Sequence, residues 1–426
     1  MKVNMNSCGK LHFGAGNTKI FSDFDGTFMP KEYNHDVICN NSSPVNEDEF
    51  SSYFGEFKQL LAPEENGKKT TELTISTGRN LGEFNYYMRK IKDKGLSIPV
   101  PDKLIVTNGG DEFLCHTTNY FENDKENMFE EWEVNTSKRK PLKKYIINWD
   151  GHKIKNHIKS FISRLSGCPL LIEPSTHQGM YGYKGDMTLQ EDIEKLPLED
   201  RTNYISLRRD GDSQIRLTAP YGSQYIEELK GLSDELLKEG YSIDFQVREN
   251  NGETFVNKAD SPNEWCNGTS IEMKPKTRGK IKTLDKYHHV KVMVDHIIQN
   301  DSGDLVIAAG DGSNDLDMLD LSNYIDGMKS SDDFSKPEFR EQVSRLPLFT
   351  IFVRNSSSVD DKIEKFERDF NFDGVKRFII VDKNDKTRPK SLVEAIKIAK
   401  EEYSKINEEY RKNAQWKFRP LTATKI

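Results

Sequence analysis

The sequence predicts an α/β fold, a doubly wound and mainly parallel sheet with an α+β domain inserted into it. Two observations favour this fold. Short apolar runs alternate with helical patterns, and each run passes directly into a polar loop, as buried parallel strands do. In addition, the polar loops at residues 77 and 311 lie much further apart in the chain than one crossover helix requires, so a separate domain is expected between them.

The expected strands of the main sheet come from both ends of the chain. Four apolar runs precede polar loops and are taken as buried strands: 18–21, 72–75, 103–106 and 305–309. A helix is predicted over residues 81–91, directly after the second of these loops. Two later apolar runs, 349–353 and 377–381, extend the sheet, and a helix is expected at 391–413. Since ligands gather beyond the carboxyl ends of such strands, the polar loops could converge on one site.

The inserted domain is expected at residues 113–272, between core segments 1–112 and 273–426. It contains one amphipathic helix and three strand-like runs: 222–239, 204–207, 213–217 and 242–247. The strongly charged stretch 122–144 is expected to be a surface loop or helix of this domain.

Composition excludes several classes of protein. The chain of 426 residues has a net charge of -7, which gives no basic excess for neutralising a nucleic-acid backbone. Its five cysteines are scattered without a CxxC pair, which favours reduced thiols in a cytoplasmic protein. No apolar run is long enough to span a bilayer, and the first residues lack the pattern of a signal peptide. The oligomeric state is not indicated.

Two carboxylates follow the first predicted strand, in the segment Asp23-Phe24-Asp25-Gly26-Thr27. At a strand end they can share one small site, where one attacks phosphorus while the other gives and takes protons. Gly26 permits a tight turn beside them. An acidic turn is the alternative, whereas a calcium loop is disfavoured because no helix supplies a carboxylate at the required spacing.

A second polar segment, Ser76-Thr77-Gly78-Arg79, follows the next strand. A hydroxyl and backbone N–H groups that open a helix can bind an anion. Taken alone, these residues also fit an ordinary helix N-cap.

A third polar segment, GDGSND at residues 310–315, follows the strand predicted at 305–309. Asp311 can hold a hard cation, with Asn314 and Asp315 near enough to orient the cation or its waters. Mg²⁺ suits this arrangement because it accepts few carboxylates and keeps waters and a phosphate oxygen. A polar turn without a metal is the alternative.

The three segments together resemble the haloacid dehalogenase superfamily, in its branch of phosphatases with an aspartate nucleophile. The signatures DxDGT, STGR and GDxxND occur in that family's order, and the resemblance covers roughly residues 16–112 and 273–385. It implies a Rossmann-like core, with an insert in the position called a C2 cap. The arrangement is similar to the branch of Cof-type sugar phosphatases and sucrose-phosphate phosphatases, whose NG turn is matched by Asn108-Gly109-Gly110.

The resemblance implies a role for each acidic residue of the motifs. Asp23 is the expected nucleophile and Asp25 the general acid/base. Mg²⁺ is expected to bind the Asp23 carboxylate, the Asp25 backbone carbonyl and Asp311, with Asp315 and Asn314 supporting the metal site.

Phosphate binding is expected from Thr77, Gly78, Asn314 and a lysine that offsets charge on the phosphate and the nucleophile. Lys286 is favoured for this lysine because it leads an apolar helical series before the strand at 305–309. Lys280 is the rival, since the loop before it resembles the family's, and Lys291 is third.

These assignments imply a Mg²⁺-dependent phosphohydrolase that acts on a small phosphorylated metabolite, with a sugar phosphate favoured, through an aspartyl-phosphate on Asp23. The alternatives are a phosphotransferase or phosphomutase with the same nucleophile, and a non-catalytic binding protein that keeps the fold. His288 and His289 are expected on a helix surface and not as zinc ligands, because no third histidine or cysteine stands at a ligand spacing.

Overall fold

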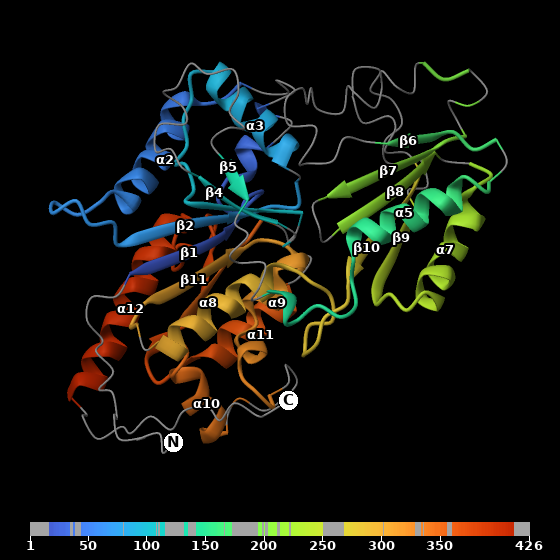
Figure 1. Ribbon diagram of the computed structural model, residues 1–426. Helices are drawn as coiled ribbons and strands as arrows, with labels where there is room; N and C mark the ends of the chain where they lie inside the picture. Colours follow the sequence, from blue (N-terminus) through green and yellow to red (C-terminus); the bar gives the residue numbers. More distant parts are fainter. Residues whose placement is uncertain are drawn as a thin grey trace. The chain divides into compact units, whose positions relative to one another are not determined.

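The computed structural model describes residues 17–34, 37–38, 44–79, 81–107, 109, 111–115, 132–134, 142–165, 167–172, 195–197, 200, 203–210, 214–220, 223–249, 268–300, 302–328, 334, 336–355 and 360–412 (Figure 1). The chain divides into two compact units. Unit 1 contains Met1–Ser22, Leu60–Glu72 and Met293–Ile426, and unit 2 contains Asp23–Gln59 and Leu73–Val292.

The main sheet has eight strands in the order β15-β12-β11-β1-β2-β3-β4-β5. Their bounds are Thr18–Asp23 (β1), Thr71–Ser76 (β2), Lys103–Val106 (β3), Asp111–Cys115 (β4), Trp132–Val134 (β5), Leu305–Gly310 (β11), Leu348–Val353 (β12) and Phe378–Val381 (β15). The pairs β1–β11, β11–β12, β12–β15 and β2–β3 are parallel, whereas β4 runs antiparallel to both β3 and β5. The predicted α/β class with a mainly parallel sheet is confirmed, and so are the six strands expected in it.

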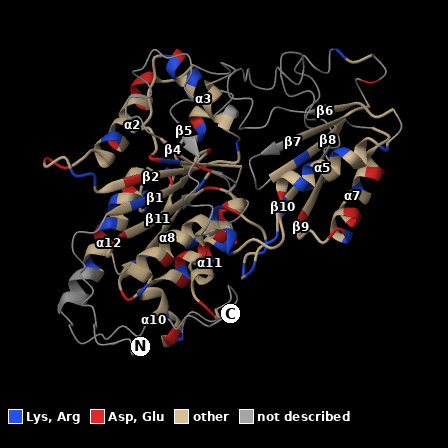
Figure 2. Cartoon of the chain, viewed as in Figure 1, with Lys and Arg blue, Asp and Glu red and all other residues tan. Residues whose placement is uncertain are grey.

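The parallel strands of unit 1 are apolar because both faces of the sheet are covered there. Strand β11 is buried along its whole length and carries no charged residue, whereas helix α12 (Leu392–Lys412) carries charges of both signs (Figure 2). Helix α12 packs against β11, β12 and β15, and helix α11 (Asp360–Phe370) packs against β15. The helix expected at 391–413 is thereby confirmed.

Two helices of the first part of the chain surround the loop that follows β1. Helix α3 (Leu81–Asp93) was expected, whereas α2 (Glu47–Leu61) was not. Helix α2 buries Phe50, Phe54 and Phe57, which recur at the spacing of one helix face. This aromatic face contacts Phe28 of the loop after β1, as described for the site.

A second sheet of five strands, in the order β6-β7-β8-β10-β9, is built from the middle of the chain. The strands are Leu170–Ile172 (β6), Ile205–Asp210 (β7), Gln214–Pro220 (β8), Ile243–Glu249 (β9) and Gly268–Pro275 (β10). Helices α5 (Gly151–Ile162) and α7 (Ile226–Lys238) pack on each other and on one face of this sheet, around an apolar core (Figure 1). The three strands and the helix expected here are confirmed.

The prediction that residues 122–144 form a surface loop or helix of the inserted domain is wrong for residues 132–134. Trp132–Val134 forms β5 of the main sheet, because β4 offers it an edge to pair with. The residues between 115 and 132 lie outside the described part of the chain. Strands β4 and β5 belong to the main sheet, so the second sheet starts further along the chain, while the predicted domain bounds of 113 and 272 stay a prediction.

The remaining elements are short, apart from helix α8, which begins at the favoured lysine. They are η1 (Lys31–Tyr33), α8 (Lys286–Asn300), η5 (Ser313–Asp315), α9 (Leu316–Leu319), η6 (Leu321–Tyr324), α10 (Pro337–Ser344), β13 (Asn371–Phe372) and β14 (Val375–Lys376). Among the described helices, none combines the length and the apolar character needed to cross a bilayer. Cys115 and Cys168 are free thiols, and the other three cysteines lie outside the described residues.

Candidate active site

Asp23 is the last residue of β1, and Asp311 directly follows β11. The two strands pair in parallel, with Ser22 opposite Ala309. Their carboxyl ends therefore lie at the same edge of the sheet, where the first and third polar segments emerge together.

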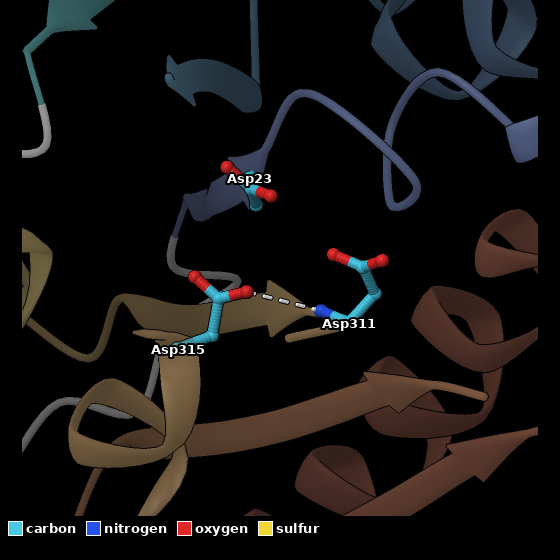
Figure 3. A group of neighbouring side chains, drawn as sticks. All are labelled: Asp23, Asp311 and Asp315. Carbon is cyan, nitrogen blue, oxygen red and sulfur yellow. Dashed lines mark hydrogen bonds between the residues drawn. The ribbon is translucent and has the colours of Figure 1, made fainter. Parts of the chain in front are cut away.

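Three carboxylates form one group at this edge, which we call the acidic triad: Asp23, Asp311 and Asp315. Each contributes an oxygen atom, and these atoms lie within 4.8 Å of one another (Figure 3). Asp23 and Asp315 are buried, and Asp311 is half-buried. Three carboxylates at such spacing repel one another unless positive charge lies between or beside them.

Asp315 shapes the loop that carries Asp311. Its Oδ2 accepts the backbone N–H of Asp311 at 3.1 Å (Figure 3). The same oxygen accepts the backbone N–H of Gly312, also at 3.1 Å. Gly310 makes this fold possible, because a Cβ at that position would lie 2.4 Å from the Cβ of Asp315. Asp315 thus fixes the backbone of the loop and also contributes a carboxylate to the acidic triad.

Asn355 is a residue of this site that the sequence reasoning missed. Its Nδ2 donates to Oδ2 of Asp311 at 2.9 Å. Asn355 follows β12, the neighbour of β11 in the sheet, so it reaches the same edge. The signal was present, because a polar residue after a predicted parallel strand is expected at the ligand-binding edge.

Lys286, the first residue of α8, contacts Asp23. Its Nζ lies 2.6 Å from Oδ1 of Asp23, and the two side chains are 3% and 9% exposed. Burial strengthens this ion pair, because little water screens it. Of the two rival lysines, Lys280 is exposed and Lys291 is half-buried.

Asp25 does not turn its side chain into the triad. Both its oxygens are held by Arg79, with Nε 3.1 Å from Oδ2 and the terminal Nη2 2.8 Å from Oδ1. The Arg79 guanidinium also lies 5.4 Å from the centre of the Tyr87 ring. A planar fork of this kind fixes the carboxylate in orientation as well as in position. The sequence reasoning quoted Arg79 within a motif but gave it no role.

The second polar segment starts helix α3 beside this loop. Thr77 is buried, its N–H donates to the carbonyl of Ile105 at 2.8 Å, and its Oγ1 accepts the N–H of Arg79 at 3.1 Å. The hydroxyl proton of Thr77 can still be donated to an anion. Gly78 and Asn314 are both exposed, and their expected part in phosphate binding stays a prediction.

Aromatic side chains anchor the first acidic motif. Between and after the two acids, Phe24 and Phe28 are fully buried. Phe24 contacts Phe84 and Tyr87 of α3, with ring centres 5.1 and 5.4 Å away. Phe28 contacts two phenylalanines of α2 at 5.1 and 5.5 Å. The acids and the aromatic residues alternate, so one side of the loop is fixed while the other presents its carboxylates.

The expected surface position of His288 and His289 is wrong. Both are buried, at 1% and 3% exposure, because the first turn of α8 packs against other parts of unit 2. His288 contacts Asp285 and Tyr145, and His289 contacts Gly109 and Glu112. Within the NG turn noted in the sequence, Gly109 is described, whereas Asn108 and Gly110 lie outside the described residues.

The acidic triad fits a divalent cation. It offers carboxylate oxygens alone, which is the donor set of hard cations such as Mg²⁺, and no histidine or thiol joins it among the described residues. Lys286 supplies one positive charge against three negative ones. A divalent ion would add positive charge beside these carboxylates, so the donor type and the electrostatics agree.

The second sheet carries polar side chains on the face opposite α5 and α7. Arg216 of β8 lies across from Glu272 of β10, and Glu272 lies across from Gln246 of β9. An Nη2 atom of Arg216 is 2.9 Å from Oε1 of Glu272, and Nζ of Lys274 is 3.9 Å from Oε2. Glu272 is buried within these ion pairs, whereas Arg216 and Gln246 are half-buried.

Comparisons with known proteins find similarity among solved structures alone. No family model matches the chain, and no match was found among curated proteins. Among solved structures, the chain is similar to yhjK, a haloacid dehalogenase-like hydrolase protein from Bacillus subtilis, with 12% sequence identity and a TM-score of 0.35. The match covers 81% of this chain and 84% of that one. A TM-score this low establishes neither fold nor function, and the geometry of the site has to support any function by itself.

Proposed function

We propose that this chain is a Mg²⁺-dependent phosphohydrolase of the haloacid dehalogenase superfamily, which acts through an aspartyl-phosphate on Asp23. The observation that carries the proposal is the acidic triad with Lys286 at its side, 2.6 Å from Asp23. Carboxylates grouped at one sheet edge with a buried lysine match the needs of phosphoryl transfer, namely a nucleophile and positive charge around the transferred group.

In the first step, a carboxylate oxygen of Asp23 attacks phosphorus and forms a new O–P bond. The bond from phosphorus to the leaving oxygen breaks, and its electron pair stays on that oxygen. Asp25 donates a proton to the leaving group, and Arg79 holds Asp25 in place for this transfer. The outcome is an acyl-phosphate and a free alcohol.

In the second step, a water molecule attacks the phosphorus of the aspartyl-phosphate. Asp25, now ionised, takes a proton from that water, and the O–P bond to Asp23 breaks. Lys286 offsets negative charge on Asp23 and on the phosphoryl oxygens in both steps, and the Thr77 hydroxyl donates to one of those oxygens.

When bound, Mg²⁺ supplies positive charge to the non-bridging oxygens of the transferred group. The carboxylates of Asp23, Asp311 and Asp315 would hold it, together with the backbone carbonyl of Asp25. Asn355 would keep the Asp311 carboxylate oriented toward the ion.

We also propose that residues 113–272 include a cap of the C2 type, which selects the substrate. The half-buried Arg216 and Gln246 on the second sheet support this role, because guanidinium and amide groups can hydrogen-bond hydroxyls of a sugar. A small phosphorylated metabolite, with a sugar phosphate favoured, is therefore the proposed substrate class. Nucleic acid is not a proposed partner, and a cytoplasmic location is proposed from the cysteine usage.

The test is hydrolysis of a generic aryl phosphate by the full chain, with Mg²⁺ and with a chelator. Wild-type protein should release phosphate only with the cation, and Asp23→Asn should lose turnover because the amide cannot attack phosphorus. Asp361→Asn, an exposed acid on α11, is the matched control and should keep wild-type activity. Turnover by Asp23→Asn close to wild type would refute the mechanism.

Product analysis with an added acceptor sugar separates the other candidate functions. Phosphate that appears on the acceptor instead of in solution would show a phosphotransferase. Cation binding without turnover on any phosphorylated metabolite would show a binding protein that keeps the fold.

A further inference from the structure

Helix α8 buries a second ionisable group one turn after Lys286. The side chain of His289 is 2% exposed, and that of Glu112 on β4 is 5% exposed. Ring atom Nε2 of His289 lies 2.9 Å from the carbonyl oxygen of Gly109, and Nδ1 lies 3.6 Å from Oε2 of Glu112. The proposed reaction uses none of these three residues, so their burial needs another reason.

The contact with Gly109 fixes the proton on the ring. A carbonyl oxygen can only accept, so Nε2 of His289 must carry the hydrogen and donate it. The other nitrogen, Nδ1, faces the Glu112 carboxyl group at 3.6 Å, which is beyond hydrogen-bond distance.

Gly109 also packs closely against the backbone of Asp285, the residue just before α8. It has a φ of +103°, and a Cβ there would lie 2.6 Å from the carbonyl carbon of Asp285. Asp285 is the residue directly before Lys286. The turn from β3 to β4 therefore contacts α8 both before the lysine and one turn after it, at His289.

We propose that His289 is a positioning residue that keeps Lys286 against Asp23 by fastening the β3–β4 turn to the first turn of α8. This inference rests on the proposed function, since the lysine matters there as the partner of the nucleophile. The first N–H groups of a helix lack partners one turn earlier in the helix, so the position of the first turn depends on the residues around it, here the Asp285 cap on Tyr287 and the contacts of Gly109. A long lysine side chain transmits any shift of that turn to its Nζ atom, and a shift of about 1 Å at a reacting group can cost about 10²-fold in rate.

Two conservative variants separate the contacts of His289. In His289→Gln the amide nitrogen falls near the position of Nε2, so donation to the Gly109 carbonyl is kept. In His289→Asn it falls near Nδ1 instead, so the contact with Gly109 is lost while a polar group still faces Glu112. Both variants are neutral amides in the same buried place, and they differ in which contact survives. His296→Gln, an exposed position on the same helix, is the control.

The primary readout is acetylation of individual lysines in the intact protein, followed by mass spectrometry. It needs no substrate and no cation, so it stands even if the proposed function fails. Lys286 should stay protected in wild type, in His289→Gln and in His296→Gln, and should react at least tenfold faster in His289→Asn. Lys274 on β10, whose side chain is 13% exposed, reports on general loosening and should be unchanged.

The second readout is the split between kcat and KM for an aryl phosphate. His289→Asn should lower kcat by about 10- to 10²-fold with little change in KM, whereas His289→Gln should stay within about threefold of wild type. Protection of Lys286 in both variants would overturn the proposal. Equal gains in reactivity at Lys286 and Lys274 would overturn it as well, because His289 would then stabilise the fold in general.

Discussion

The ion pair between Lys286 and Asp23 makes a quantitative prediction about stability. Lys286→Met keeps most of the side-chain volume and removes the charge that lies 2.6 Å from Asp23. Both side chains are buried, so water cannot replace the lost partner. The carboxylate left behind also lies among the other two members of the acidic triad, within 4.8 Å of them.

The expected size follows from this burial. Breaking a buried ion pair by removing one partner costs about 3 to 5 kcal/mol of unfolding free energy. The repulsion within the acidic triad places the cost for Lys286→Met in the upper part of that range. A cation that binds the folded state should restore part of it, about 2.7 kcal/mol when its concentration is 100 times its Kd.

The assay is equilibrium unfolding in urea, followed by circular dichroism, in a chelator and in excess Mg²⁺. Lys280→Met is the matched control, because Lys280 is exposed and should cost less than about 0.5 kcal/mol. In the activity assay Lys286→Met should lower kcat by about 10²- to 10³-fold, as the loss of a charge-stabilising donor does. If Lys286→Met were as stable as wild type in the chelator, or if Lys280→Met cost as much, the assignment of the lysine would be refuted.

Three further substitutions test the site and one helix. Asn355→Ala removes the amide that orients the half-buried carboxylate of the triad, so Mn²⁺ affinity by electron paramagnetic resonance should fall about tenfold; unchanged affinity would exclude this role. Gly310→Ala places a Cβ 2.4 Å from that of Asp315, and should abolish Mn²⁺ binding in a protein that still folds; tight binding would contradict the close packing. Asp150→Ala should cost about 1 kcal/mol in urea unfolding, because Asp150 caps α5. The backbone hydrogen bond from Lys153 lowers the pKa of Asp150. The capping contribution to stability is therefore present above the unfolded-state pKa and is lost as the pH falls through the lower folded-state pKa. A stability difference between Asp150→Ala and wild type that grew on acidification would contradict this.

The main sheet could be predicted because its strands are buried on both faces. The run at 305–309 became β11 with one more residue, since a strand covered on two sides must be apolar throughout. The acidic triad followed from the same logic, because Asp23 ends β1, Asp311 directly follows β11, and Asp315 lies in the polar segment after β11. Lys286 could be singled out because it opens an apolar helical series, α8.

Other parts of the fold depend on partners that a sequence does not reveal. Strand β5 lies in a charged segment and exists because β4 offers it an edge. Helix α2 was missed although Phe50, Phe54 and Phe57 have helical spacing, so that omission was avoidable. The burial of His289 depends on contacts with Gly109 and Glu112, which are far away in the chain.

The grip of Arg79 on Asp25 is likewise a tertiary contact. The two residues stand in different motifs, and their pairing requires the loop after β1 and the start of α3 to meet. Sequence spacing places each motif at a strand end, but it does not say how their side chains divide between substrate, cation and each other. The role of Asn355 was open to inference from its position after β12, whereas its hydrogen bond to Asp311 was not.

The alternation of acids and aromatic rings after β1 means that substitutions in the hydrophobic core can alter the active site. Phe24 packs against rings of α3, and Phe28 packs against rings of α2. The orientation of the carboxylates therefore depends on residues that do not contact a substrate. A conservative substitution of the buried Phe54 would have the same effect as a substitution in the active site, namely slow turnover by a protein that still folds. Catalysis therefore constrains the buried aromatic residues of α2 as well as the acidic residues of the site.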